Sequence, residues 1–143
     1  YCGLSAILIP KSTFEIDHVL PKSVKEDNGI YNIVCACKYC NRKKSDFYCE
    51  SYDNQELLHP DNNHLQEVFY RDQEYYIRVN DLYKNNSDIV GFYKQLGLMD
   101  ENKRIEYLIL EIRDFCEKYC NDSSLNKLKF SLDRLREKWN QQS

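Results

Sequence analysis

A pair of cysteines, Cys37 and Cys40, most constrains how this chain of 143 residues can fold. Their C-x-x-C spacing is typical of a turn in which two thiolates bind the same zinc ion. Structural zinc sites have four ligands, so two more are required. We expect Cys2 to be the third, and the fourth to lie upstream of Tyr1. The pair therefore predicts a zinc knuckle that ties the start of the chain to residues 37–40.

The remaining four of the seven cysteines carry weaker signals. Cys35 lies in an apolar run and is expected to be a buried core thiol, whereas Cys49 is ambiguous. Cys116 and Cys120 are one helical turn apart, which favours core or interface positions over metal binding. The odd number of cysteines, with no signal-peptide pattern and no membrane-length apolar run, favours a reducing, cytoplasmic setting without membrane association.

Residues 1–50 have the pattern of two short strands and a helix. Residues 13–20 alternate in character and end before Pro21, as expected for a strand. Residues 27–29 form a turn signal, and residues 30–35 are a second β-prone run. Residues 37–44 then indicate a knuckle followed by a short helix. The predicted order is strand, loop, strand, helix.

The rest of the chain indicates an α+β fold that is mainly helical toward its C-terminus. Residues 68–70 and 75–79 favour a small hairpin. Ser87 is the predicted cap of a helix that Gly97 ends. Two amphipathic helices follow, over 105–119 and 125–139. We expect a motif at 1–50 and, at 51–143, a region that acts as a scaffold or docks a partner.

Four polar residues of the first region suit phosphodiester hydrolysis. This reaction needs a base to activate water and a divalent cation to neutralise charge on the phosphate. His18 is the candidate base, because an imidazole titrates near neutral pH. Asp17 and Asn41 offer the oxygen ligands that Mg²⁺ prefers. Asn32 is expected to hold the strand or loop in place.

Charge alone does not indicate a nucleic-acid partner, since the formal net charge is −3. The acidity lies in residues 51–100, where nine Asp or Glu outnumber four Lys or Arg. A local basic cluster stands beside the knuckle and is the candidate phosphate contact. A solvated surface is the alternative for these residues, which are Lys38, Arg42, Lys43 and Lys44.

These motifs closely resemble the HNH, or ββα-metal, endonucleases over about residues 1–47. The resemblance is carried by the segments Glu15–Ser23, Asn32–Cys37 and Cys37–Asp46. It implies a ββα-metal fold with His18 as general base. It also implies Asp17 and Asn41 as ligands of catalytic Mg²⁺ or Mn²⁺, Asn32 as a positioning residue, and structural zinc. The last motif position is Asn41, so the chain resembles a His-Asn-Asn variant.

A further stretch resembles the HNH subunit of Septu-type anti-phage defence systems. The segments that carry this resemblance are His59–Asp61 and the region through Leu96–Leu98. It implies an ATPase partner and a role in antiviral defence. His59 and His64 are expected to be structural or surface residues.

Three functional hypotheses follow. The first is Mg²⁺-dependent hydrolysis of DNA, with nicking as the default because one motif carries one cleavage centre. The second is a zinc-knuckle module that binds nucleic acid or protein without catalysis. The third is a nuclease subunit that stays inactive until a partner delivers DNA. A binding module has no need of Asp17 and His18, so their presence favours an enzyme. The target sequence, DNA versus RNA, and the oligomeric state stay open.

Overall fold

The computed structural model describes residues 1–3, 14–119 and 125–142, with residues 135–142 described by their backbone alone. The chain divides into two compact units, Tyr1–Arg104 and Ile105–Ser143. The first unit contains the predicted motif and the candidate site. Cys120, which was expected at a core or interface position, lies outside the described residues.

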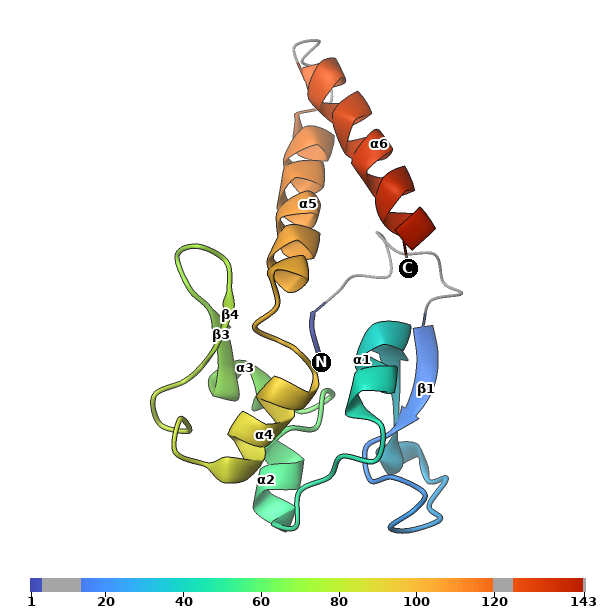
Figure 1. Cartoon of the computed structure of the whole chain (residues 1–143), viewed down its shortest axis with the longest axis vertical. Coiled ribbons are helices and arrows are strands. Elements are labelled where there is room, and N and C mark those ends of the chain that lie inside the picture. The colour runs from blue at the N-terminus through green and yellow to red at the C-terminus, as the bar shows by residue number, and fades with distance from the viewer. Residues whose placement is uncertain (4–13, 120–124, 143) are drawn as a thin grey trace. The chain divides into compact units, whose positions relative to one another are not determined.

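The motif is a β-hairpin with a helix packed against it (Figure 1). Strand β1 (Phe14–His18) pairs antiparallel with β2 (Ile33–Cys37), and helix α1 (Lys38–Lys44) follows at once. The Cys37 sulfur accepts a hydrogen bond from the Cys40 backbone N–H and so caps α1. The predicted order of strand, strand and helix is confirmed. Residues 30–32 are a correction, because they form the 3-10 helix η2 (Ile30–Asn32) and not the start of β2.

The hairpin has one covered face and one open face. Val34 and Ala36 of β2 are buried, whereas Cys35 between them is exposed. Ile16, which is paired with Cys35 across the hairpin, is 69% exposed. The expectation that Cys35 is a core thiol was therefore wrong. Side chains alternate between the faces of a strand, so an apolar run alone does not decide which of its members are buried.

Residues 50–86 contain more regular structure than their polar sequence indicates. Two short helices, α2 (Tyr52–Leu57) and α3 (Leu65–Val68), precede the predicted hairpin. That hairpin is confirmed as β3 (Phe69–Arg71) paired with β4 (Ile77–Val79). Ser51 caps α2 by accepting from the Asn54 backbone N–H. The buried residues Leu58 and Val68, each next to or within one of these helices, explain why the segment folds.

Helix α4 (Ser87–Gln95) is capped by the residue before Ser87, which was the predicted cap. Asn86 caps it, because its Oδ1 accepts from the backbone N–H groups of Asp88 and Ile89. Gly97 follows the helix with a φ of 61°, a conformation that glycine adopts without a steric penalty. The predicted C-terminal stop is therefore confirmed, and the cap is corrected by one residue.

The core of the first unit is centred on Phe92 of α4. Its ring lies 5.5 Å from the ring of Tyr1 and 5.6 Å from that of Phe47, in edge-on geometry. Phe69 stacks on it at 6.2 Å. The same buried cluster contains the sulfurs of the knuckle and the side chains of Leu58, Ile89, Leu96 and Leu98, among others. Tyr1, Phe47 and the sulfurs of the knuckle thus share one core with residues 58–98.

In the second unit, the residues that the structure describes are mainly helical. Helix α5 (Glu101–Lys118) begins within the first unit, and α6 (Asn126–Gln142) follows it. Both predicted amphipathic helices are confirmed. Cys116 is buried, as the sequence pattern predicts, and Leu132 is buried as well. None of the helices in the described parts of the chain combines the length and the apolar character that crossing a membrane requires.

Candidate active site

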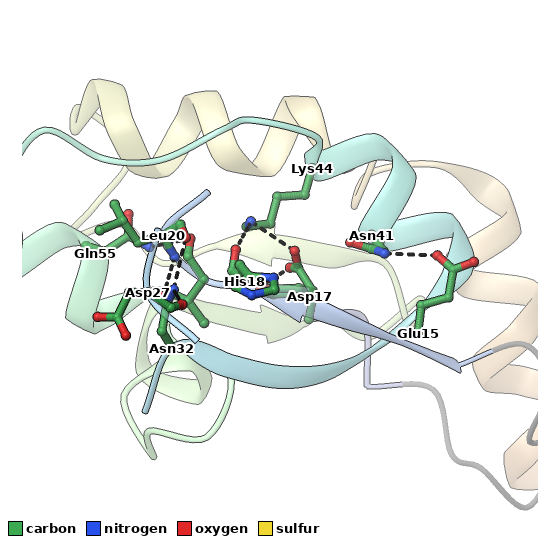
Figure 2. Close-up of polar contacts among 11 residues, drawn as sticks. Glu15, Asp17, His18, Leu20, Asp27, Asn32, Asn41, Lys44 and Gln55 are labelled. Atoms are coloured by element: carbon green, nitrogen blue, oxygen red, sulfur yellow. Dashed lines mark hydrogen bonds and ion pairs between the residues drawn. The ribbon is translucent and has the colours of Figure 1, made fainter. Parts of the chain in front are cut away.

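The site is built where one face of β1 meets α1. Glu15 and Asp17 are two residues apart on β1, so both point to the same side of the hairpin. Asn41 and Lys44 are three residues apart on α1, so both lie on one helix face. The two spacings match, and each carboxylate faces one of the helix residues (Figure 2).

Asp17 is buried, with 5% of its surface exposed, and both of its oxygens are bonded. Its Oδ2 accepts from the hydroxyl of Tyr1 at 2.6 Å, and its Oδ1 accepts from the Lys44 ammonium at 3.2 Å. Burial, followed by the negative charge of Asp17, raises the pKa of Tyr1 far above its ordinary value. The phenol therefore stays protonated and remains a donor to Asp17. Each carboxylate oxygen still has a second lone pair available.

Lys44 is 1% exposed and holds two parts of the strand end together. Besides Asp17, its ammonium donates to the backbone carbonyl of His18 at 2.7 Å. Burial lowers the pKa of Lys44, and the neighbouring Asp17 opposes this effect. Lys44 was predicted to contact phosphates, but its ammonium is buried and hydrogen-bonded within the protein.

His18 is half-buried, and its ring has a defined partner. Nε2 lies 3.0 Å from Oδ1 of Asn28. An amide oxygen has no hydrogen to give, so Nε2 donates and carries the proton. In a neutral imidazole, Nδ1 then keeps its lone pair and is able to take a proton. The contact with Asn28 fits the tautomer in which Nδ1 carries no proton.

Asn32 fastens the loop that follows β1. Its Nδ2 donates to the carbonyls of Leu20 and Asp27, and its Oδ1 accepts from the Leu20 backbone N–H at 2.7 Å. Its own carbonyl accepts from the Val19 backbone N–H. This one side chain therefore bridges the two ends of the loop that carries Asn28, the partner of His18.

Asn41 has a partner other than Asp17. Its Nδ2 donates to Oε2 of Glu15 at 2.9 Å. Asp17 and Asn41, which were expected to share one cation, thus face the same interface but are hydrogen-bonded to different residues. Of the basic residues nearby, Arg42 and Lys43 are exposed and Lys38 is half-buried. These three side chains are therefore more accessible to solvent than the buried Lys44.

The predicted zinc ligands come together as a buried cluster. Cys2, Cys37 and Cys40 each offer a sulfur, and the three sulfurs lie within 4.8 Å of one another. The sulfurs of Cys2 and Cys37 are 3.7 Å apart. Two thiolates on a tetrahedral zinc ion are separated by about 3.8 Å when each bond is about 2.3 Å long. The spacing of the cluster therefore fits zinc, with three of the four ligands present.

Hydrogen bonding within the cluster divides its protons unequally. The contacts from Cys37 and Cys40, and to a smaller extent the positive charge of Lys103, lower the pKa of the Cys2 thiol to about 2. The same contacts with Cys2 raise the pKa of Cys37 and of Cys40. Cys49 lies outside the sulfur cluster. Its pKa is raised to about 12, mainly by burial.

Sequence reasoning missed Tyr1, Glu15 and Asn28 as residues of the site, and it missed the pairing role of Lys44. Two of them had a local signal. Glu15 stands at i−2 from Asp17 on a strand, and Lys44 stands at i+3 from Asn41 on a helix. Tyr1 had none, because its contact with Asp17 spans 16 residues. His59 and His64 lie elsewhere: His59 bonds to the Tyr31 carbonyl, and His64 is an exposed partner of Glu67.

No curated protein and no solved structure matches the chain significantly. One family model does match, over the segment that contains the hairpin, α1 and the sulfur cluster. Residues 1–47, about a third of the chain, match the family of HNH endonucleases.

Proposed function

We propose that this chain is a metal-dependent endonuclease that hydrolyses phosphodiester bonds in DNA. The observation that supports it most is the arrangement around His18: a ring whose Nε2 is tied to Asn28, next to a buried carboxylate on the same strand. The match of residues 1–47 to the HNH endonucleases agrees with a nuclease in general. The identity of the metal and the role of each residue are part of the proposal.

His18 acts as the general base in this proposal. Its Nδ1 accepts a proton from a water molecule, and the resulting hydroxide attacks the phosphorus in line with the ester oxygen that leaves. Asn32 keeps the loop closed and so keeps Asn28 against the ring. A base fixed in this way needs no rearrangement at the moment of reaction.

The groups suited to a hard divalent cation are Asp17 and Asn41, because carboxylate and amide oxygens are the ligands that Mg²⁺ or Mn²⁺ prefers. Tyr1 and Lys44 occupy one lone pair on each Asp17 oxygen, which leaves the others for a cation. A bound cation would supply positive charge against the charge that develops on the phosphate. Lys44 restrains Asp17 and the His18 carbonyl together, so it also fixes the base relative to this carboxylate.

Structural zinc and a short basic surface complete the proposal. Zinc bound by Cys2, Cys37 and Cys40 would hold the first residues of the chain against the start of α1. Lys38, Arg42 and Lys43 on that helix would contact DNA phosphates, which are recognised largely through Lys and Arg. The resemblance of the segments 59–61 and 96–98 to Septu-type HNH subunits supports a cytoplasmic role in antiviral defence with an ATPase partner.

The test is nicking of supercoiled plasmid DNA with Mg²⁺ or Mn²⁺, with and without candidate partner subunits. We expect cleavage by the unsubstituted protein. His18→Ala should lower the rate by about 100-fold or more, the usual contribution of a positioned base. Equal cutting by His18→Ala would disprove the assignment of the base. A protein that binds DNA but never cuts, with any metal or partner, would leave the zinc-knuckle binding module as the better account.

A further inference from the structure

The hydrogen bond between Asn41 and Glu15 determines which way the Asn41 amide faces. The bond joins Nδ2 of Asn41 to Oε2 of Glu15 at 2.9 Å and is half-buried between α1 and β1 (Figure 2). An ionised carboxylate has acceptors and no donor, so only the NH₂ side of an amide is able to face it. The amide oxygen of Asn41 is therefore directed away from Glu15.

The opposite orientation of the amide is costly at this position. A rotation of 180° would bring Oδ1 of Asn41 against the Glu15 carboxylate, where two acceptors repel each other, and would break the bond at Nδ2. A hydrogen bond to a charged acceptor is about twice as strong as one between neutral groups. Glu15 thus selects one of two amide orientations that are almost identical in shape.

This selection matters for metal binding, because an amide binds a cation through its oxygen alone. We propose that Glu15 is a positioning residue that holds the Asn41 amide with Oδ1 presented to the divalent cation. The inference rests on the proposed function, since it assigns Glu15 a role at the same site. Loss of a residue that orients a metal ligand typically lowers metal affinity by about 10- to 100-fold.

The backbone at Glu15 allows this role to be tested without loss of the fold. Glu15 is paired with Ala36 in the β1–β2 ladder, so backbone hydrogen bonds keep the residue in its place. Its side chain is half-buried and lies outside the hydrophobic core. Removing the carboxylate therefore frees the amide of Asn41 while leaving the hairpin and α1 paired.

The experiment measures Mn²⁺ affinity by electron paramagnetic resonance in the unsubstituted protein and in three variants. Glu15→Ala should raise the Kd roughly 10- to 100-fold, as loss of an orienting partner does. Glu15→Gln retains an acceptor, but its own amide is able to turn, so the Kd should rise by less than in Glu15→Ala. Glu50→Ala removes an exposed carboxylate elsewhere and should leave the Kd unchanged. Thermal unfolding of each variant reports any loss of the fold.

A second measurement detects the bond itself. In the unsubstituted protein, the hydrogen bond should shift one of the two side-chain N–H proton signals of Asn41 downfield and slow its exchange with water, and both effects should be lost in Glu15→Ala. An unchanged Mn²⁺ Kd in Glu15→Ala, or a loss equal in Glu50→Ala, would overturn this inference and leave the proposed function standing. Failure of the unsubstituted protein to bind Mn²⁺ would overturn both.

Discussion

The hydroxyl of Tyr1 donates a 2.6 Å hydrogen bond to Asp17, and Tyr1 is the residue next to Cys2 of the sulfur cluster. On the other side of the site, Asn41 directly follows Cys40 of the same cluster. The residue before Cys2 and the residue after Cys40 therefore both lie in the candidate active site. The sulfur cluster and the candidate active site are therefore linked through the backbone, and a change in the cluster should displace residues of the site.

Replacement of Tyr1 by Phe should destabilise the protein and loosen Asp17. The buried Oδ2 would lose its donor, which costs about 1–3 kcal/mol for an unsatisfied buried acceptor. We expect a free energy of unfolding lower by that amount, measured by urea denaturation. Tyr52→Phe is the matched control, since Tyr52 is 75% exposed. A difference from Tyr52→Phe of less than about 0.5 kcal/mol, which is ordinary for surface substitutions, would contradict the prediction.

Loss of zinc should unfold the start of the chain and abolish cleavage. Cys2→Ser removes one of three clustered sulfurs, and structural zinc contributes directly to folding free energy. We expect about one zinc per chain in the unsubstituted protein by elemental analysis. In Cys2→Ser we expect little zinc and an unfolding midpoint lower by on the order of 10 °C.

The control for zinc is Cys35→Ser, because Cys35 is exposed on the open face of the hairpin. This variant should keep its zinc, its unfolding midpoint and its activity. Less than about half a zinc in the unsubstituted protein would contradict a four-ligand structural site. So would a Cys35→Ser variant that loses as much zinc as Cys2→Ser.

The contributions of Lys44 and Asp17 to the free energy of unfolding should be coupled. Lys44→Met leaves the Asp17 charge buried without its cation, which costs about 3–5 kcal/mol for a broken buried pair. Asp17→Asn alone likewise leaves the Lys44 charge unpaired. The double variant removes both charges. We therefore expect its loss of unfolding free energy to be smaller than the sum of the losses in the two single variants. Urea denaturation of the four proteins measures this coupling.

An additive double variant would show that the two side chains do not interact in solution. Because Lys44 also bonds to the His18 carbonyl, a residual loss is expected even when Asp17 is neutral. Lys43→Met, at the exposed neighbouring position, is the control for loss of a positive charge on α1 and should change stability by less than about 0.5 kcal/mol.

Local patterns in the sequence were sufficient for both hairpins, for helices α1, α4, α5 and α6, and for the sulfur cluster, but not for η2, α2 and α3. The spacing of Cys37 and Cys40 has a direct geometric meaning, and the alternation ending at Pro21 marks a strand. The cap of α4 was placed one residue late because Asn85, Asn86 and Ser87 all have capping side chains. Such choices depend on which side chain reaches the free N–H groups, and composition does not decide this.

Contacts across the site were beyond sequence reasoning because they depend on how α1 crosses the hairpin. The pairs Asp17–Lys44 and Glu15–Asn41 span 27 and 26 residues. A shift of the helix by one turn would replace both pairs, because a different helix residue would then face each carboxylate. The burial of Lys44 follows from the same crossing, and a basic run next to a knuckle gives no sign of it. The orientation of Cys35 depends on strand register in the same way.

The β3–β4 hairpin should give the protein part of its sensitivity to acid through Asp72. Its carboxylate accepts from Arg78 Nε at 2.6 Å and from two backbone N–H groups of the turn, which lowers its pKa below the ordinary 3.8. A lowered folded pKa means stability that is present above pH 3.8 and lost as pH falls through the folded value. Asp72→Asn should therefore flatten the loss of stability below pH 3.8, as measured by urea denaturation across pH. The exposed Asp81→Asn should retain the full slope, and an equal slope in Asp72→Asn would contradict the prediction.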